Sequence, residues 1–340
     1  MSLYVNIEKQ LDSFALRVHF ETENETMALL GASGCGKSMT LKCIAGIVTP
    51  DRGRIVLNDR VLFDSEKKIN LTPQQRRVGY LFQQYALFPN MTVEQNILCG
   101  IREGTKAEKR ALLAEKLRMF RLEGLEKKQP AQLSGGQQQR VALSRILCSE
   151  PQAILLDEPF SALDSYLKWN LELELAELLG SFQGPILWVS HDRGECCRNC
   201  RSVCVMEDGV TGEVMPMEEL FRRPATCSAA RLAGCRNFFR AEARESGVYL
   251  PEWNCTLPLP VDGRTFTTLA VPDGAAIPGG ALCCAIVRRI ADVEHEIFLL
   301  RPLDAPEGAP PLYLELPWGA VGREEKTLSL TLKPERLLLL

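Results

Sequence analysis

Residues 26–38 read TMALLGASGCGKS: an apolar, strand-like run leads directly into the spacing G-x-x-x-x-G-K-S. This spacing between a strand and a helix is typical of a loop that binds phosphate. Its glycines let backbone N–H groups converge on an anion, and the N-terminus of the next helix adds partial positive charge. Lys37 can reach the outer phosphates of a nucleotide, and the Ser38 hydroxyl can bind Mg²⁺. We expect the nucleotide to contact Gly31, Ser33, Gly34, Cys35, Gly36, Lys37, Ser38 and Met39.

A second apolar run, AILLD at 153–157, ends in two acids, Asp157 and Glu158. Asp157 can hold Mg²⁺ through its water shell, and Glu158 can point at the terminal phosphate and polarise an attacking water. A strand that simply ends in exposed carboxylates is the alternative interpretation, but the phosphate-binding spacing favours the catalytic one. Strands that alternate with helices around such a loop predict an α/β core.

Residues 133–137 read LSGGQ and precede a helical pattern. A serine and two glycines at the start of a helix form a second site for an anion. The same letters also suit a plain helix cap with a tight turn. One chain does not need two such sites for one terminal phosphate, so we expect the second to face a nucleotide held by another copy of the chain. The residues concerned are Ser134, Gly135, Gly136 and Gln137.

The three motifs, in their order along the chain, resemble those of the ATP-binding cassette (ABC) ATPases over roughly residues 1–235. The resemblance implies a P-loop NTPase fold of the α/β class, with a helical subdomain at about 86–150. It also implies that Gln83, or its neighbour Gln84, is the glutamine that contacts Mg²⁺ and the attacking water.

Two further residues take their roles from the same resemblance. Asp164 in SALD resembles the D-loop aspartate, and His191 in WVSHD resembles the switch histidine that contacts the terminal phosphate. The family stacks adenine on an aromatic residue near the N-terminus, for which Phe14 is our candidate and Tyr4 the alternative. Both aromatic residues also suit strand positions packed in a core.

The resemblance further implies a pair of cassettes, head to tail, with ATP and Mg²⁺ held between them. Glu158 would be the general base, and His191 would stabilise the transition state. Hydrolysis would open the pair and move a membrane permease. A solute-binding protein would deliver the solute to this permease. The chain would then lie peripherally on the cytoplasmic face of the cell membrane.

Residues 53–89 resemble the ATPase subunits of molybdate importers, which favours molybdate or tungstate as the solute. The ATPases of sulfate, iron(III), sugar and polyamine importers share most of this segment. Residues 236–340 are rich in short β-like runs and resemble the small all-β barrel of the OB/TOBE type. This barrel could bind an oxyanion at Arg236 and Asn237 and regulate transport, or it could only stabilise a dimer.

The sequence has 340 residues, 13 of them cysteines, and a formal net charge of −3. This charge argues against a nucleic-acid partner, and we expect no export signal and no membrane-spanning run. A non-transport ABC ATPase and an oxyanion sensor with a degenerate cassette are the alternatives. The cysteines at 196, 197, 200 and 204 have metal-like spacing, but on one helix they would rarely converge on a metal, so we expect them to pack.

Overall fold

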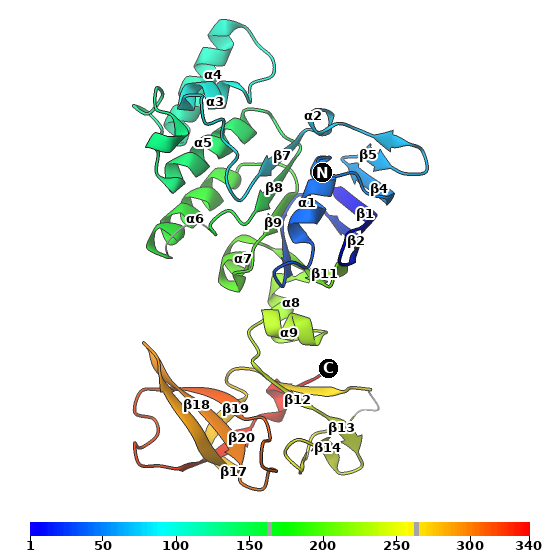
Figure 1. The fold of residues 1–340 in the computed structure, drawn as a ribbon, viewed down its shortest axis with the longest axis vertical. Coiled ribbons are helices and arrows are strands. Elements are labelled where there is room, and N and C mark those ends of the chain that lie inside the picture. Colours follow the sequence, from blue (N-terminus) through cyan, green and yellow to red (C-terminus); the bar gives the residue numbers. More distant parts are fainter. Residues whose placement is uncertain (162–164, 262–264) are drawn as a thin grey trace. The chain divides into compact units, whose positions relative to one another are not determined.

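The computed structural model describes residues 1–161, 165–261 and 265–340. The chain divides into two compact units, Met1–Glu218 and Glu219–Leu340 (Figure 1). This division lies earlier in the chain than the predicted boundary between residues 235 and 236. Within the described residues, no helix is both long and apolar enough to cross a bilayer.

The first unit is built on one large mixed sheet, in the order β6-β5-β4-β1-β2-β11-β10-β3-β9-β8-β7. Strands β10, β3, β9, β8 and β7 are mutually parallel, and β1, β2, β4, β5 and β6 form antiparallel pairs. The bounds are β1 (Leu3–Gln10), β2 (Ala15–Thr22), β3 (Thr26–Gly31), β4 (Arg52–Leu57), β5 (Arg60–Asp64), β6 (Ile69–Asn70), β7 (Val78–Leu81), β8 (Ala153–Asp157), β9 (Ile186–Val189), β10 (Ser202–Glu207) and β11 (Val210–Pro216).

The parallel part of the sheet positions the predicted site. All residues of β8 and β9 are buried, as expected for parallel strands that are covered on both faces. Because parallel strands end at the same edge, the segments that follow β3, β7, β8 and β9 lie at one edge of the sheet. These are the segments that carry the phosphate-loop motif, Gln83, Glu158 and His191.

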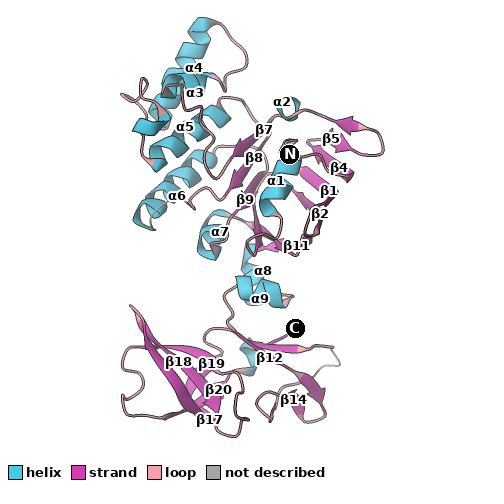
Figure 2. Ribbon diagram, viewed as in Figure 1, coloured by secondary structure: helices cyan, strands magenta, loops and turns pink. Residues whose placement is uncertain are grey.

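Most helices of this unit lie beside the parallel part of the sheet (Figure 2). Between residues 86 and 150, the described regular elements are all helical, as the sequence pattern predicted for this segment. The bounds are α1 (Lys37–Ala45), α2 (Pro73–Arg76), α3 (Val93–Leu98), α4 (Lys106–Met119), η1 (Pro130–Gln132), α5 (Gly135–Leu147), α6 (Ser165–Leu179), α7 (Arg193–Asn199) and α8 (Met217–Arg222), which spans the division between the units.

The second unit confirms the expected small β domain. Its described strands form three hydrogen-bonded sheets, β12-β16-β21, β13-β14-β15 and β19-β18-β17-β20, rather than one continuous barrel. Trp253, Phe239 and Phe298 are buried in its apolar core. The bounds are α9 (Cys227–Leu232), β12 (Asn237–Arg240), β13 (Glu242–Arg244), β14 (Gly247–Leu250), β15 (Cys255–Leu257), β16 (Thr268–Val271), β17 (Ala276–Ala291), β18 (His295–Pro302), β19 (Leu312–Pro317), β20 (Thr327–Leu332), η2 (Pro334–Arg336) and β21 (Leu338–Leu339).

The four clustered cysteines do not share one helix. Helix α7 ends at Asn199, Cys200 caps it, and Cys204 lies in β10. Cys196, Cys200 and Cys204 are buried, whereas Cys197 is exposed. Burial raises the pKa of Cys204 to about 12. Cys204 therefore remains a thiol at neutral pH, and the three buried side chains pack as small apolar groups.

Candidate functional site

In the phosphate loop, residues 31–38, the lysine side chain is hydrogen-bonded to neutral backbone groups. The Lys37 ammonium donates to the carbonyl oxygens of Gly31 and Ala32, both at 2.8 Å. The Lys37 side chain is buried within the loop. Because neutral carbonyls do not cancel its charge, Lys37 remains available to attract an anion at the start of α1.

Two glycines of this loop are required by space and by backbone angle. A Cβ at Gly31 would lie 2.3 Å from the carbonyl oxygen of Met206, so no side chain fits there. Gly36, which caps α1, has φ of 112°, a conformation that favours glycine. These two positions explain why the motif needs glycine at its first and last glycine positions.

A hydroxyl and a carboxylate meet beside the loop. Ser38 Oγ donates to Asp157 Oδ1 at 2.7 Å, and Tyr80 Oη donates to Asp157 Oδ2 at 2.8 Å. Burial and the nearby Asp157 raise the pKa of Tyr80 far above its usual range, so the phenol stays protonated. Hydroxyl and carboxylate oxygens are the donors that Mg²⁺ prefers, and nucleotide phosphates commonly complete its coordination. Ser38 and Asp157 therefore fit a Mg²⁺ ion.

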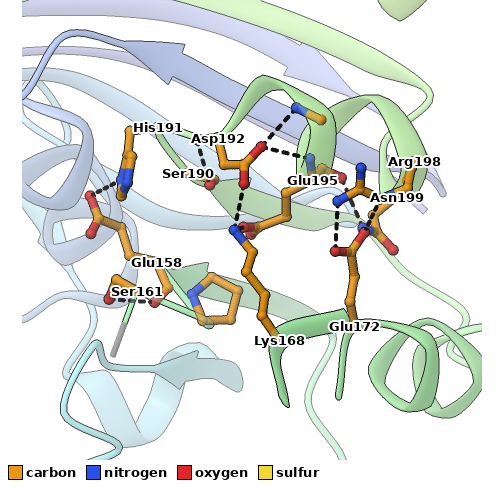
Figure 3. A network of polar contacts seen from close by, with 12 residues as sticks. Glu158, Ser161, Lys168, Glu172, Ser190, His191, Asp192, Glu195, Arg198 and Asn199 are labelled. Carbon is orange, nitrogen blue, oxygen red and sulfur yellow. Dashed lines mark hydrogen bonds and ion pairs between the residues drawn. The ribbon is translucent and has the colours of Figure 1, made fainter. Parts of the chain in front are cut away.

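Glu158, Gln83 and His191 form one cluster at the edge of the sheet. Gln83 Nε2 lies 3.3 Å from Glu158 Oε2 and 3.2 Å from Ser161 Oγ. His191 Nδ1 lies 3.5 Å from Glu158 Oε1 (Figure 3). The structure thus brings together all three residues that the sequence analysis named as catalytic. Ser161, the first residue of the SALD segment, is an additional member.

The backbone of Glu158 is in the left-handed region, with φ of 48°. Such a conformation is uncommon for a residue with a Cβ and is often found at functional sites. The N–H of Glu158 donates to the carbonyl of Val189 in β9 at 2.9 Å, which ties β8 to the neighbouring strand at this turn. This turn directs the carboxylate away from the sheet and toward Gln83 and His191.

A small cleft lies against the same carboxylate. It has a volume of about 180 Å³ and is lined in part by Glu158, Ser161, His191, Lys168 and Glu195. One water takes up about 30 Å³, so the cleft has room for several waters beside Glu158. Its volume suits water molecules rather than a whole nucleotide.

A polar network that the sequence analysis missed extends this cluster (Figure 3). Lys168 on α6 donates to Asp192 Oδ2 at 2.6 Å and lies 3.0 Å from Glu195 Oε2. Asp192 Oδ1 accepts from the backbone N–H groups of Gly194 and Glu195 and so caps α7. The acid-x-x-Glu spacing at 192–195 is a recognisable helix start, but no local signal pairs either acid with Lys168.

Burial and pairing set the pKa values of this network in opposite directions. Burial raises the pKa of the Glu195 carboxyl, although Trp188 and Lys168 donate to it. Burial is the largest single influence on Asp192 and Lys168 and opposes their charges, but their hydrogen bonds and the nearby opposite charges together outweigh it. The pKa of Asp192 is therefore lowered and that of Lys168 is raised. Lys168 thus carries a charge between two acids.

The LSGGQ segment is a helix cap in this chain. Ser134 Oγ accepts from the Gln137 N–H at 3.3 Å, and Gln137 Oε1 accepts from the Ser134 N–H at 3.0 Å. Gly136 is buried against Leu171, whereas Ser134 and Gly135 are exposed. In the part of the chain that the structure describes, no hydrogen bond or ion pair joins residues 134–137 to the phosphate loop. The serine and first glycine face outward instead.

The two aromatic candidates for adenine stacking, Phe14 and Tyr4, lie in different surroundings. The Phe14 ring lies 3.4 Å from where a Cβ of Gly36 would be, so it is next to the phosphate loop, and it also packs on the core. Tyr4 contacts His19 edge to face, with ring centroids 6.0 Å apart. Asp164 lies outside the described residues.

The suggested oxyanion site of the second unit is occupied by internal contacts. Arg236 Nη1 donates to Glu315 Oε1 at 2.7 Å and to the Tyr313 hydroxyl. Asn237 exchanges hydrogen bonds with the backbone of Tyr313 and donates to Val271 O. The carboxylate of Glu315 neutralises Arg236, so this pair is a structural contact rather than an open anion site.

Comparison with known proteins adds the following. The family model described as "ABC transporter" matches residues 17–161. The chain is 42% identical over 221 residues to the spermidine/putrescine import ATP-binding protein of Methylococcus capsulatus, covering 64% of this chain and 56% of that protein. It is 38% identical over 222 residues to the molybdenum import ATP-binding protein of Rhodospirillum rubrum, covering 65% of this chain and 60% of that protein.

A third relative is covered more fully. The Fe(3+) ions import ATP-binding protein of Streptomyces coelicolor is 35% identical over 300 residues, which is 87% of this chain and 84% of that protein. Among solved structures, a dimeric ATP-binding cassette in a post-hydrolysis state, bound to ADP and Pi, matches with a TM-score of 0.53 and 27% identity. The match covers 64% of this chain and 99% of that one.

Proposed function

The chain belongs to the ABC transporter family, among the ATP-binding proteins of importers, and from this premise we propose that it hydrolyses ATP to drive solute import. The observation that carries the proposal is the convergence of Lys37, the Ser38–Asp157 pair and the Glu158 cluster at one edge of the sheet. Phosphate binding, metal binding and water activation would then occur at one place, which is the arrangement that phosphoryl transfer requires.

In the proposed reaction, the phosphate loop and Lys37 hold the β- and γ-phosphates of ATP. Glu158 accepts a proton from a water in the adjoining cleft as the water oxygen attacks the γ-phosphorus. The bond from this phosphorus to the bridging oxygen breaks, and ADP and phosphate are formed. His191 donates a hydrogen bond to the γ-phosphate oxygens, whose charge increases in the transition state.

Mg²⁺, when bound, would neutralise charge on the β- and γ-phosphates. Ser38 and Asp157 would hold it, together with the carbonyl oxygen of Gln83. The amide nitrogen of Gln83 already donates to Glu158 and Ser161, so its other atom is the one left for a cation. Gln83 would thus connect the ion to the general base.

A second copy of the chain would complete the nucleotide site. Ser134 and Gly135 are exposed at the N-terminus of α5, where a helix favours an anion. We assign them, with Gly136 and Gln137, to the γ-phosphate held by the partner cassette. The solved cassette that matches this chain is dimeric, which supports this arrangement. Asp164 would lie at the same contact, as the resemblance implies.

A permease and a solute-binding protein are the further partners that we propose, with the chain peripheral on the cytoplasmic face of the membrane. For the solute we propose molybdate or tungstate, on the resemblance of residues 53–89. The relatives above are named for import of polyamines, molybdenum and iron(III). Polyamines, iron(III), sulfate and sugars are therefore the solutes that compete with molybdate and tungstate. The second unit is proposed as a TOBE-like domain.

The catalytic proposal is tested by the steady-state ATPase rate of the full chain. Glu158→Gln should lower kcat by about 10²- to 10⁴-fold, the usual contribution of a general base. Glu150→Gln is the matched control, because Glu150 also has a left-handed backbone (φ of 48°) but lies before β8. If Glu158→Gln hydrolyses ATP at the rate of the control, the assigned chemistry is wrong.

The solute is tested in liposomes that contain the chain with its permease and binding protein. ATPase rates are compared with molybdate, tungstate, sulfate, iron(III), spermidine or no solute. Stimulation by molybdate or tungstate alone supports our assignment. Stimulation by another solute keeps the importer and replaces the solute, and a rate that responds to none of them contradicts the importer role.

A further inference from the structure

The loop that carries His191 is fixed mainly through its backbone and its neighbours. The His191 side chain is 65% exposed. Within the described residues, its polar contact is with Glu158 alone, at 3.5 Å. An exposed imidazole with one long contact does not hold its own orientation. Its position must therefore come from the residues on either side, Ser190 and Asp192.

Asp192 is held on both of its carboxylate oxygens. One oxygen caps α7 through the N–H groups of Gly194 and Glu195, and the other accepts from Lys168 at 2.6 Å. The Asp192 N–H also donates to Ser190 Oγ at 3.0 Å. Lys168 comes from a different element, α6, and is the group that ties this loop to the opposite wall of the cleft (Figure 3).

Glu195 makes a second contact between Lys168 and the segment that follows His191. Its carboxylate is 3% exposed and accepts from Trp188 Nε1 at 2.6 Å, while its other oxygen lies 3.0 Å from Lys168. Trp188 is in β9, the strand that leads into Ser190 and His191. Glu195 therefore joins the strand before the His191 loop to the helix after it, and Lys168 holds this helix start from α6 through Asp192 and Glu195.

A second polar contact joins the same two helices one turn farther along. Glu172 on α6 is buried, and it accepts from Arg198 Nε at 2.7 Å, from Arg198 Nη2 at 2.8 Å and from Asn199 Nδ2 at 2.7 Å. This contact holds α6 against α7, but it lies at the far end of α7 from His191. It provides an internal control, because it stabilises the helix pair without contacting the loop.

We propose that Lys168 is a positioning residue for His191: it holds the 190–192 loop through Asp192 and Glu195 so that the imidazole is aligned on the terminal phosphate. The inference rests on the proposed ATPase function. Lys168 does not touch the nucleotide in this proposal. It acts before the reaction, by keeping the loop in the geometry that the transition state needs.

The test is a double-mutant cycle on the full chain, measured as kcat and KM for ATP. Lys168→Met keeps the length of the side chain and removes its charge. A misplaced catalytic group costs up to about 100-fold, so we expect kcat to fall by about 10- to 100-fold with KM changed less than about twofold. In a His191→Ala background the same substitution should change kcat by less than about twofold, because the group it positions is absent.

Lys168→Arg should restore most of kcat, since it keeps the charge between the two acids. Glu172→Gln is the structural control: it should lower Tm while kcat stays within about twofold of the wild type. If Glu172→Gln lowers kcat as much as Lys168→Met does, or if the Lys168→Met loss persists in full without His191, the role is only structural and the proposal fails.

Removal of Lys168 leaves Glu195 buried without its cation, so Lys168→Met could unfold the chain. Asp192→Asn is the second variant, because asparagine still caps α7 but does not pair with Lys168. It should lower kcat in the same His191-dependent way. The two proposals fail differently: loss of the Glu158→Gln effect contradicts the ATPase, whereas full additivity with His191→Ala contradicts only the role of Lys168.

Discussion

Lys37 in the first unit and Arg236 in the second are both cations that the sequence analysis placed at anion sites, and the structure treats them differently. Lys37 is bound by two neutral carbonyls, at 2.8 Å each. Arg236 is bound by the carboxylate of Glu315, at 2.7 Å. A carbonyl leaves the charge of its partner intact, whereas a carboxylate cancels it. A basic residue is thus open to an anionic ligand when its internal partners are neutral.

The largest effect that would sharpen this contrast comes from removing each cation. Lys37→Met should lower kcat/KM for ATP by at least about 100-fold, because an aligned charge on the transferred phosphoryl group is lost. Arg236→Met should leave the ATPase rate of the full chain unchanged. Steady-state assays with both variants measure this, and a comparable loss in Arg236→Met would break the comparison.

The next largest effect is expected on folding stability, from one glycine substitution in each unit. The substitution in the first unit causes a steric clash, whereas the one in the second unit only strains the backbone. Gly31→Ala would place a Cβ 2.3 Å from a carbonyl oxygen and should destabilise the first unit by about 3 kcal/mol. Gly319→Ala, in the second unit, meets no atom within 4 Å, but its φ of 76° should cost about 1 kcal/mol. Urea unfolding of each variant gives the two values, and equal costs would show that the phosphate loop can relax.

A smaller effect, on anion binding, is expected when the carboxylate that pairs with Arg236 is removed. Glu315→Gln removes the neutralising carboxylate, so the variant should bind molybdate weakly through Arg236. The measurement is calorimetric titration in a Lys37→Met background, which excludes binding at the phosphate loop. Adding Arg236→Met should abolish the binding. If the parent chain with Glu315 intact already binds molybdate through Arg236, the contact is no barrier to ligand and our distinction is wrong.

The smallest effect is a pH dependence in the second unit. Burial and the hydrogen bond to Glu315 raise the pKa of Tyr313 from 10.0 to about 12. A raised folded-state pKa contributes stability that is fully present below pH 10 and is lost as the pH rises through 12. The wild type should therefore lose more stability between pH 10 and 12 than Tyr313→Phe does. Parallel denaturant curves for the two proteins would show no difference if Tyr313 titrates normally.

The catalytic cluster was accessible to sequence analysis to the extent that its members lie in short motifs. Gly31 to Ser38 are contiguous, and Asp157 and Glu158 end an apolar run, so local spacing predicts them without tertiary information. Gln83 and His191 needed the family resemblance, because a lone glutamine or histidine after a strand has no local signature. The structure then placed both within 3.5 Å of Glu158.

The contacts of Lys168 and of the clustered cysteines could not be predicted from local sequence patterns. Lys168 is one of four charged residues on α6, and its partners at 192 and 195 lie on another element. The spacing of Cys196, Cys200 and Cys204 suits a helix, but the chain leaves α7 at Asn199 and Cys204 continues in β10. Only the packing of the complete sheet decides such pairings.

The sequence by itself determined the phosphate loop, the acids that end β8 and the α/β character of the first unit. These depend on contiguous residues, whose glycine angles, apolar runs and helix starts are local physical properties. Only folding leaves Lys37 bound by neutral carbonyls, pairs Arg236 with the carboxylate of Glu315, and brings Lys168 to the loop of His191. Electrostatic pairing depends on distances between residues far apart in the chain, and those distances exist only after folding.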